Sequence, residues 1–154
     1  MRNLFFILLM LLSLTAVAQN ADKLYEQGKA LYDKEKYDEA VLKLRPAAEQ
    51  GHKKAQYRMG RLYSKGRGVP KDHAKAVYWY EKAAAQGHAK SMYRLAKCYY
   101  KANGVQQDVA KAKSLLLKAV SDKKNGKDIL YDLKKDAKSG DDDAKALLKL
   151  IGKG

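Results

Sequence analysis

The sequence contains few of the residues that would point to a disulfide-rich or disordered protein. Cys98 is the only cysteine among 154 residues, so a scaffold of intrachain disulfide bonds is excluded. Two prolines and a hydrophobic content of 46% argue against a disordered chain. The length suits one compact domain or one short array of repeats.

Motifs for catalysis and metal binding are also missing. The sequence has no His-Glu-x-x-His, no Gly-x-Ser-x-Gly and no Gly-x-x-x-x-Gly-Lys. His52 and His88 each follow a glycine and recur 36 residues apart, which marks them as repeat positions, and His73 has Val109 as its counterpart. We therefore expect no catalytic residue, no metal site, no cofactor and no enzymatic activity.

Acidic residues are few, and the charge is unevenly distributed. The chain has 17 Asp and Glu against 32 Lys and Arg, a formal net charge of +15. Residues 51–122 hold most of the excess, with 16 basic and four acidic residues, whereas residues 19–50 have six basic and seven acidic ones. A positive balance of this size favours an acidic partner through long-range attraction.

One long apolar run is present, Leu4–Leu12, and it lies near the start of the chain. Arg2 precedes it and Ala16-Val17-Ala18 follows it, an order typical of a signal peptide. The run is shorter than the ~20 residues needed to span a bilayer. We predict a signal peptide at 1–18, cleavage near Ala18 and a soluble periplasmic or secreted protein; an uncleaved anchor and a buried N-terminal helix are the alternatives.

A repeat of 36 residues is the clearest feature of the sequence. Aligning 51–86 with 87–122 gives 15 identical positions out of 36, far more than chance. This period is typical of solenoids built from helix pairs. Among the matches, Gly51 suits a helix end that needs a positive φ, Gly68 an internal turn, and Asp72 a helix N-cap.

The spacing of apolar residues predicts helices rather than strands. Ala55, Met59 and Leu62 fall at i, i+4 and i+7, and the pattern continues in the second half of each repeat. Cys98 aligns with Leu62, so we expect a buried thiol rather than a reactive one. The sequence thus predicts an all-α protein made of helix hairpins.

The repeat resembles the Sel-one-like (Sel1-like) repeat, a relative of the tetratricopeptide repeat, in an exported bacterial form. The resemblance rests on the sequences at 55–60, 66–72 and 75–84, which read AQYRMG, GRGVPKD and KAVYWYEKAA. It implies an α-α superhelix, a right-handed solenoid of antiparallel helix hairpins. The implied organisation is a tetratricopeptide-like first repeat at 19–50, Sel1-like repeats at 51–86 and 87–122, and a degenerate helical C-terminal cap at 123–154.

The two ends of the array depart from the repeat pattern. Tyr37 should open a helix that runs to about Gln50, and Pro46 inside it removes one backbone hydrogen bond at a cost of ~3 kcal/mol. After the second full repeat we expect helices near 128–138 and 142–151. Asp141, Asp142 and Asp143 suit a helix N-terminus, where the macrodipole favours anions. Four apolar residues could seal the last face of the solenoid: Leu147, Leu148, Leu150 and Ile151.

Basic residues follow the first helix of each full repeat with a spacing of 4, 3 and 4, which places them on one helix face. The equivalent positions of the first repeat form an acidic ridge of Asp22, Glu26 and Asp33, interrupted by Lys29. The family resemblance implies that first helices line a concave, partner-binding groove. The predicted partner-binding residues are Lys54, Tyr57, Arg58, Arg61, Lys65, Lys90, Tyr93, Arg94, Lys97 and Lys101.

Three functions remain open at this point, besides the alternative that the basic residues are only a solvated face. The first is a non-catalytic, exported adaptor that binds an acidic protein or peptide. The second is a charge-driven binder of an anionic envelope polymer or nucleic acid, with steep salt dependence. The third is an envelope enzyme such as a penicillin-binding hydrolase, but the cysteine-rich relatives with that link rely on paired cysteines. So short an array is also compatible with a homo-oligomer.

Overall fold

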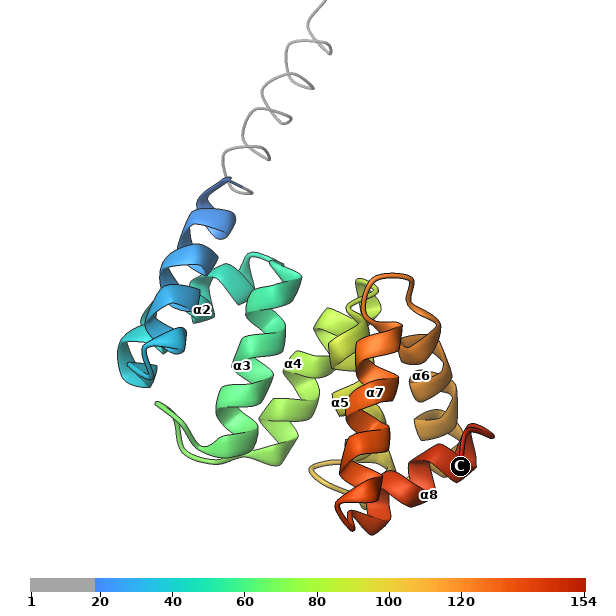
Figure 1. Cartoon of the computed structure of the whole chain (residues 1–154). Helices are drawn as coiled ribbons and strands as arrows, with labels where there is room; N and C mark the ends of the chain where they lie inside the picture. Colours follow the sequence, from blue (N-terminus) through green and yellow to red (C-terminus); the bar gives the residue numbers. More distant parts are fainter. Residues whose placement is uncertain (1–18) are drawn as a thin grey trace, which may run out of the picture. The chain divides into compact units, whose positions relative to one another are not determined.

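The computed structural model describes residues 19–154, which form α-helices joined by turns (Figure 1). The predicted signal peptide at 1–18 lies outside the described residues. No β-strand occurs within residues 19–154. In the same range, no helix has the length and apolar character needed to cross a membrane.

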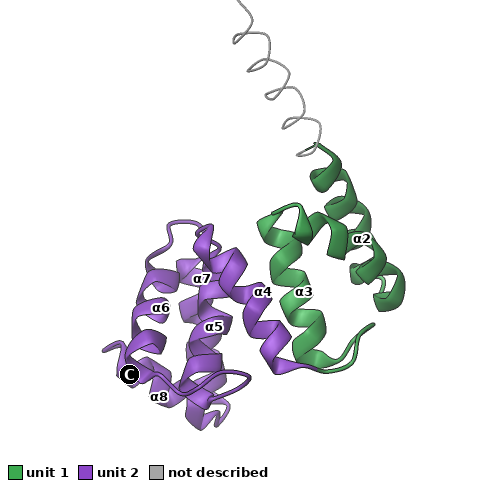
Figure 2. Cartoon of the chain, turned by 180° about the vertical axis from the view of Figure 1, so that it is seen from behind, with its two compact units in different colours: residues 1–71 green, residues 72–154 purple. Residues whose placement is uncertain are grey.

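The chain divides into two compact units, residues 1–71 and 72–154 (Figure 2). The boundary falls in the turn between the two predicted helices of the 51–86 segment. In the first unit, a helix over residues 19–33 precedes two further helices. These are α2 (Tyr37–Glu49) and α3 (Lys53–Lys65). The second unit contains α4 (His73–Ala85), α5 (Ala89–Lys101), α6 (Val109–Ser121), α7 (Gly126–Lys138) and α8 (Asp142–Leu150).

Helices α3 to α6 begin at side-chain caps that alternate between histidine and aspartate. Asp72 accepts a hydrogen bond from the Lys75 backbone N–H at 2.9 Å, and Asp108 caps α6 in the same way. The predicted aspartate caps are therefore confirmed. No capping role was predicted for the histidines, yet Nδ1 of His52 accepts a hydrogen bond from the Ala55 N–H at 3.1 Å. His88 caps α5 in the equivalent position.

The predicted glycine turns are present, and they have a packing role as well. Gly68 and Gly104 adopt φ values of +66° and +71°. A Cβ on Gly104 would lie 2.3 Å from the carbonyl oxygen of His73, at the start of α4. A Cβ on Gly68 would meet the carbonyl oxygen of Tyr37, at the start of α2, at 2.6 Å. In each unit, the turn thus packs so closely against a helix start that only glycine fits.

Pro46 lies inside α2, as predicted, and the structure explains how the helix tolerates it. A residue other than proline would donate its N–H to the carbonyl of Leu42. Leu42 is 73% exposed, so water can reach the residue whose carbonyl loses this partner. The helix continues past the proline, and the carbonyl of Pro46 accepts from the Gln50 N–H at 3.0 Å.

The core of the second unit lies among α5, α6, α7 and α8. Leu116, Leu133 and Leu147 are fully buried there, at the centre of one cluster of apolar side chains. Burying each of these side chains contributes about 1.5–3 kcal/mol. The predicted terminal helices are found, and three of the four residues expected to seal the last face, Leu147, Leu148 and Ile151, are buried. Leu150 packs against the same cluster.

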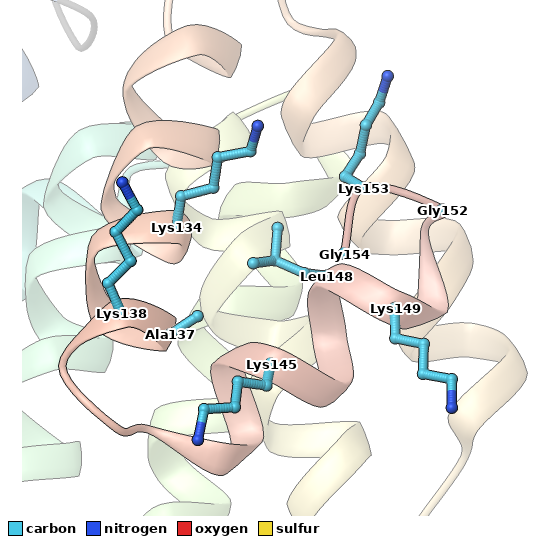
Figure 3. A pocket seen from close by; sticks show the side chains of 9 residues that line it. All are labelled: Lys134, Ala137, Lys138, Lys145, Leu148, Lys149, Gly152, Lys153 and Gly154. Atoms are coloured by element: carbon cyan, nitrogen blue, oxygen red, sulfur yellow. The ribbon is translucent and has the colours of Figure 1, made fainter.

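The α7–α8 hairpin also borders a pocket of about 790 Å³ (Figure 3). Residues of both helices and of the segment after α8 line it. They are Lys134, Ala137, Lys138, Lys145, Leu148, Lys149, Gly152, Lys153 and Gly154.

Candidate partner-binding surface

The ten predicted partner-binding residues fall into two sets of five, one on each first helix. Lys54, Tyr57, Arg58, Arg61 and Lys65 lie on α3 in the first unit. The second set, Lys90, Tyr93, Arg94, Lys97 and Lys101, lies on α5 in the second unit.

On α3, Arg58 is held by residues of the helix over 19–33 rather than extended into solvent. Its side chain is only 16% exposed, and its Nη1 lies 3.5 Å from Oδ1 of Asp33. The guanidinium also stacks over the Tyr32 ring, 4.6 Å from the centroid, and Arg61 lies 5.7 Å from the same centroid. These arginines and Tyr32 form one cluster in which cation–π attraction holds two positive charges close together.

Asp33 links this cluster to a second cation. Lys29 donates a hydrogen bond to Oδ2 of Asp33 at 3.0 Å. This bond, with a smaller contribution from the positive charge of Arg58, lowers the pKa of the Asp33 carboxyl below its ordinary value. The carboxylate consequently stays charged at neutral pH. Asp33 belongs to the acidic ridge predicted for the first repeat, and it lies at the end of the helix over residues 19–33.

The remaining α3 residues differ in their surroundings. Lys54 lies 5.8 Å from the centroid of the Tyr25 ring, and Tyr57 is half-buried. Lys65 is exposed and forms no ion pair within residues 19–154. Lys54 and Lys65 thus keep their ammonium groups accessible at the two ends of the helix.

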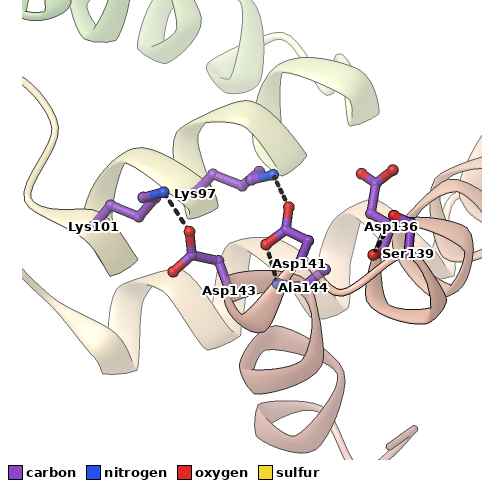
Figure 4. A network of polar contacts seen from close by, with 7 residues as sticks. All are labelled: Lys97, Lys101, Asp136, Ser139, Asp141, Asp143 and Ala144. Carbon is purple, nitrogen blue, oxygen red and sulfur yellow. Dashed lines mark hydrogen bonds and ion pairs between the residues drawn. The ribbon is translucent and has the colours of Figure 1, made fainter.

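On α5, two lysines are paired with acidic residues at the start of α8 (Figure 4). Lys97 Nζ lies 3.9 Å from Oδ2 of Asp141, and Lys101 donates a hydrogen bond to Asp143. Asp141 also caps α8 by accepting from the Ala144 N–H at 3.0 Å. The cap is the main reason that the pKa of Asp141 lies below its ordinary value, with Lys97 adding to the effect.

Tyr93 is buried, in contrast with the groove-facing ring that the sequence suggested. It is 7% exposed and belongs to the apolar cluster shared with α7 and α8. Burial raises the pKa of its hydroxyl to about 12. Arg94 lies 5.6 Å from the ring centroid, and Lys97 lies 5.9 Å from it. Tyr93 therefore packs beneath this face, and its ring is not accessible for stacking with a partner.

Lys90 completes the second set. It is exposed and forms no ion pair within the described part of the chain. Arg94 is half-buried. The cationic face of α5 is consequently most accessible at its N-terminal half, because the C-terminal half is occupied by the two α8 aspartates.

The carboxylates that hold these basic residues were not identified as their partners from the sequence. Asp141 and Asp143 were recognised only as suitable for a helix N-terminus, and Asp33 only as part of an acidic ridge. The available signal was charge complementarity between segments 25 to 44 residues apart. Many other lysines in the chain satisfy it equally well, so it could not select these pairs.

The environment of Cys98 disfavours a reactive thiol. The Cys98 thiol is free and half-buried, somewhat more open than its alignment with Leu62 suggested. Burial raises its pKa to about 11, which disfavours the nucleophilic thiolate. Within residues 19–154, no group of three or more histidine, cysteine, aspartate or glutamate side chains could hold a metal ion.

Known proteins with a similar sequence or structure identify the type of fold. The family model described as Sel1 repeat matches residues 53–88 and 89–122. A Sel1 repeat protein from Oxalobacter formigenes has 31% sequence identity and a TM-score of 0.62, over 90% of this chain and 96% of that one. No curated protein matches the sequence.

Two further solved structures are similar. The protective antigen c5321 of uropathogenic Escherichia coli, which has an SLR fold, shows 27% identity and a TM-score of 0.66 over 90% of this chain. This chain covers only 32% of that protein. Cysteine-rich protein B of Helicobacter pylori shows 20% identity and a TM-score of 0.54, over 88% of this chain and 95% of that one, a likeness of fold alone.

These neighbours confirm the predicted class, an all-α helical-repeat (α-α superhelix) fold. Proteins built from such repeats generally act as non-catalytic scaffolds for protein–protein interaction. With 31% identity over nearly the whole length of a Sel1 repeat protein, and two matched repeats, this chain belongs to the Sel1 repeat family.

Proposed function

We propose that this protein is an exported, non-catalytic adaptor that binds acidic segments of a protein partner on the basic faces of α3 and α5. The family supports a protein partner. The acidic character of the partner, the binding faces and the export are our inference from charge, side-chain chemistry and the N-terminal sequence pattern.

The observation that carries the proposal is that the face of α3 already holds a carboxylate. Arg58 and Asp33 are paired at 3.5 Å, beside the Tyr32 ring that orients the guanidinium. An arginine stacked on an aromatic ring keeps further N–H donors for a second carboxylate. Arg61, on the same ring, extends this arrangement along the helix.

The α5 face also supports the binding of acidic segments, although its charges are distributed differently. Its C-terminal lysines are paired with Asp141 and Asp143, so the fold itself uses this surface to hold carboxylates. Lys90, which is exposed, remains accessible to a partner. Because surface ion pairs are individually weak, at about 0–1 kcal/mol each, an acidic segment must engage several of these cations together.

Export is the part of the proposal that rests on sequence alone. The apolar run Leu4–Leu12, Arg2 before it and Ala16-Val17-Ala18 after it carry this inference. Mass spectrometry of the protein recovered from an envelope fraction tests it. A mature N-terminus at Gln19 is expected, and an intact Met1 in the cytosol would contradict it.

Binding is tested with a fluorescent peptide of ten glutamates, measured by anisotropy at low and high salt. The variant Lys54→Gln/Lys65→Gln/Lys90→Gln removes three exposed charges from the two faces without breaking an ion pair. We expect the affinity of the α3 face to fall about fivefold, since two contacts of ~0.5 kcal/mol each are lost there, and that of the α5 face to fall about twofold, since one is lost.

The matched control is Lys43→Gln/Lys113→Gln/Lys118→Gln, which removes the same charge from exposed positions on α2 and α6. Unchanged peptide affinity in the control supports the assigned faces. Equal weakening in both variants would show diffuse attraction and contradict them. Tighter binding of single-stranded DNA than of the peptide, with a steeper salt dependence, would favour an anionic polymer as the ligand instead.

A further inference from the structure

The pocket beside the α7–α8 hairpin is a separate feature of the second unit. Its volume of about 790 Å³ lies within the ~300–1,000 Å³ typical of small-molecule sites. Nine residues line it. That number is well below the roughly 20–30 residues that each side of a standard protein interface contributes. Its dimensions therefore suit a small ligand better than a protein surface.

The lining combines an apolar centre with a cationic rim. Ala137 and Leu148 lie in the middle of the pocket, and the ammonium groups of the lysines lie around them (Figure 3). Every polar side chain in the lining is a lysine, which donates hydrogen bonds and accepts none. A ligand held by these side chains must therefore supply acceptor atoms. The five lysines are Lys134 and Lys138 of α7, Lys145 and Lys149 of α8, and Lys153 after α8.

The rim is poorly neutralised by the protein's own acids. Lys145 pairs with Asp142 at 2.7 Å, and Asp142 is almost fully exposed. Within residues 19–154, the other four rim lysines form no ion pair. Like charges around one hollow repel each other, and an anion bound between them would relieve that repulsion. The α5 face differs here, because two of its lysines already have carboxylate partners.

We propose that this pocket binds a small amphipathic anion of the fatty-acid class. The alkyl chain rests on Ala137, Leu148 and the aliphatic stems of the lysines, which can cover apolar groups while their charges stay at the edge. The carboxylate lies among the ammonium groups at the rim. An inorganic anion cannot use the apolar centre, and a neutral alcohol carries no charge for the cationic rim. Each should therefore bind more weakly than the fatty acid.

The ligand test is isothermal titration calorimetry of the protein with decanoate, kept below its micelle-forming concentration. Decanol and inorganic phosphate are titrated in parallel. We expect saturable binding of about one decanoate per chain, and at least tenfold weaker binding of the other two compounds. No saturable decanoate binding, or phosphate binding of equal affinity, would overturn the proposal.

The site is tested with Lys134→Gln/Lys138→Gln/Lys153→Gln, which should weaken decanoate binding at least tenfold. The control Lys113→Gln/Lys118→Gln/Lys123→Gln carries the same total charge but changes exposed positions outside the lining. Its affinity should stay within twofold of the unmodified protein. Equal weakening in both variants would indicate diffuse charge attraction and overturn the assigned pocket, and circular dichroism verifies that each variant is folded.

Discussion

Each unit has a helix with basic residues along one face. The acidic residues that pair with them come from opposite directions along the chain in the two units. In the first unit, Asp33 lies at the end of the helix over residues 19–33, before α2 and α3, and pairs with Arg58. In the second unit, Asp141 and Asp143 lie at the start of α8, after α5, and pair with Lys97 and Lys101. The two Sel1 repeats thus supply the basic faces, whereas helices outside these two repeats supply the acids.

Because of this pairing, a partner would meet fewer accessible positive charges than the net charge of residues 51–122 suggests. The repeated basic pattern is largely the same on both helices, but part of it is used to attach a flanking helix in each unit. The accessible cations are then the ones beyond reach of those acids, such as Lys54, Lys65 and Lys90. A partner would meet several separated charges, not two complete ridges.

The largest expected effect concerns Tyr57 on α3 and Tyr93 on α5, which occupy equivalent repeat positions. Tyr93 is buried in a core that includes α7 and α8, whereas Tyr57 is half-buried. We expect Tyr93→Ala to lower the free energy of unfolding by about 3 kcal/mol, because it leaves a cavity in a packed cluster. Tyr57→Ala should lower it by less than half as much. Urea unfolding followed by circular dichroism measures both, and equal losses would show that the two units bury this position alike.

A smaller effect is expected at the helix ends before the glycine turns. Gly66 ends α3 at φ +66°, and its equivalent Ala102 ends α5 at φ +57°. A left-handed conformation strains alanine by about 1–2 kcal/mol relative to glycine. Ala102→Gly should therefore stabilise the protein by about 1 kcal/mol, and Gly66→Ala should destabilise it by a similar amount. Opposite signs in thermal unfolding support the comparison; a loss of stability in Ala102→Gly contradicts it.

The smallest effect concerns the histidine cap of α3 and its dependence on pH. His52 stacks on Tyr25 with ring centroids 4.2 Å apart, and burial lowers the pKa of its imidazole below 6.5. The nearby Asp22 carboxylate opposes this shift but is largely exposed, so burial dominates. The cap also requires an unprotonated Nδ1.

With the folded pKa below the unfolded one, the unfolded chain binds more protons as the pH falls through about 6.5. The contribution of His52 to stability should therefore be present above that pH and decrease below it. His52→Asn keeps a capping oxygen and removes the titration, so its urea midpoint should change less between pH 7.5 and pH 5.0. An identical change in both proteins would show that other groups titrate in this window. The capping aspartates Asp72 and Asp141, whose pKa values are lowered from 3.8, affect stability only at lower pH.

Most of the local structure could be predicted because its causes lie within a few residues. The aspartate caps, the positive φ of Gly51 and Gly87 and the terminal helices all follow from short-range patterns. The histidine caps were missed because a histidine after a glycine is compatible with many roles. The close fit of Gly68 and Gly104 was also missed, because their neighbours lie 31 residues earlier in the chain.

The candidate surface was less predictable for the same physical reason. Helical periodicity placed the basic residues on one face of α3 and of α5, and each face was then modified by a helix distant in sequence. Tyr93 and Tyr57 have the same local pattern, but only Tyr93 joins the core formed with α7 and α8. The lysine-rimmed pocket has no sequence motif, since its lining is collected from two helices and the segment after them.

The sequence by itself determined the helices, their aspartate caps, the repeat and its family, since the local structure of each repeat depends on hydrogen bonds and apolar spacing within one or two turns of a helix. Only the tertiary structure decided which charges are paired, which tyrosine is buried and where the lysines surround a hollow. Those outcomes depend on contacts between segments tens of residues apart. Many pairings of similar charge and shape are available to one sequence, and the packing of the helices selects among them.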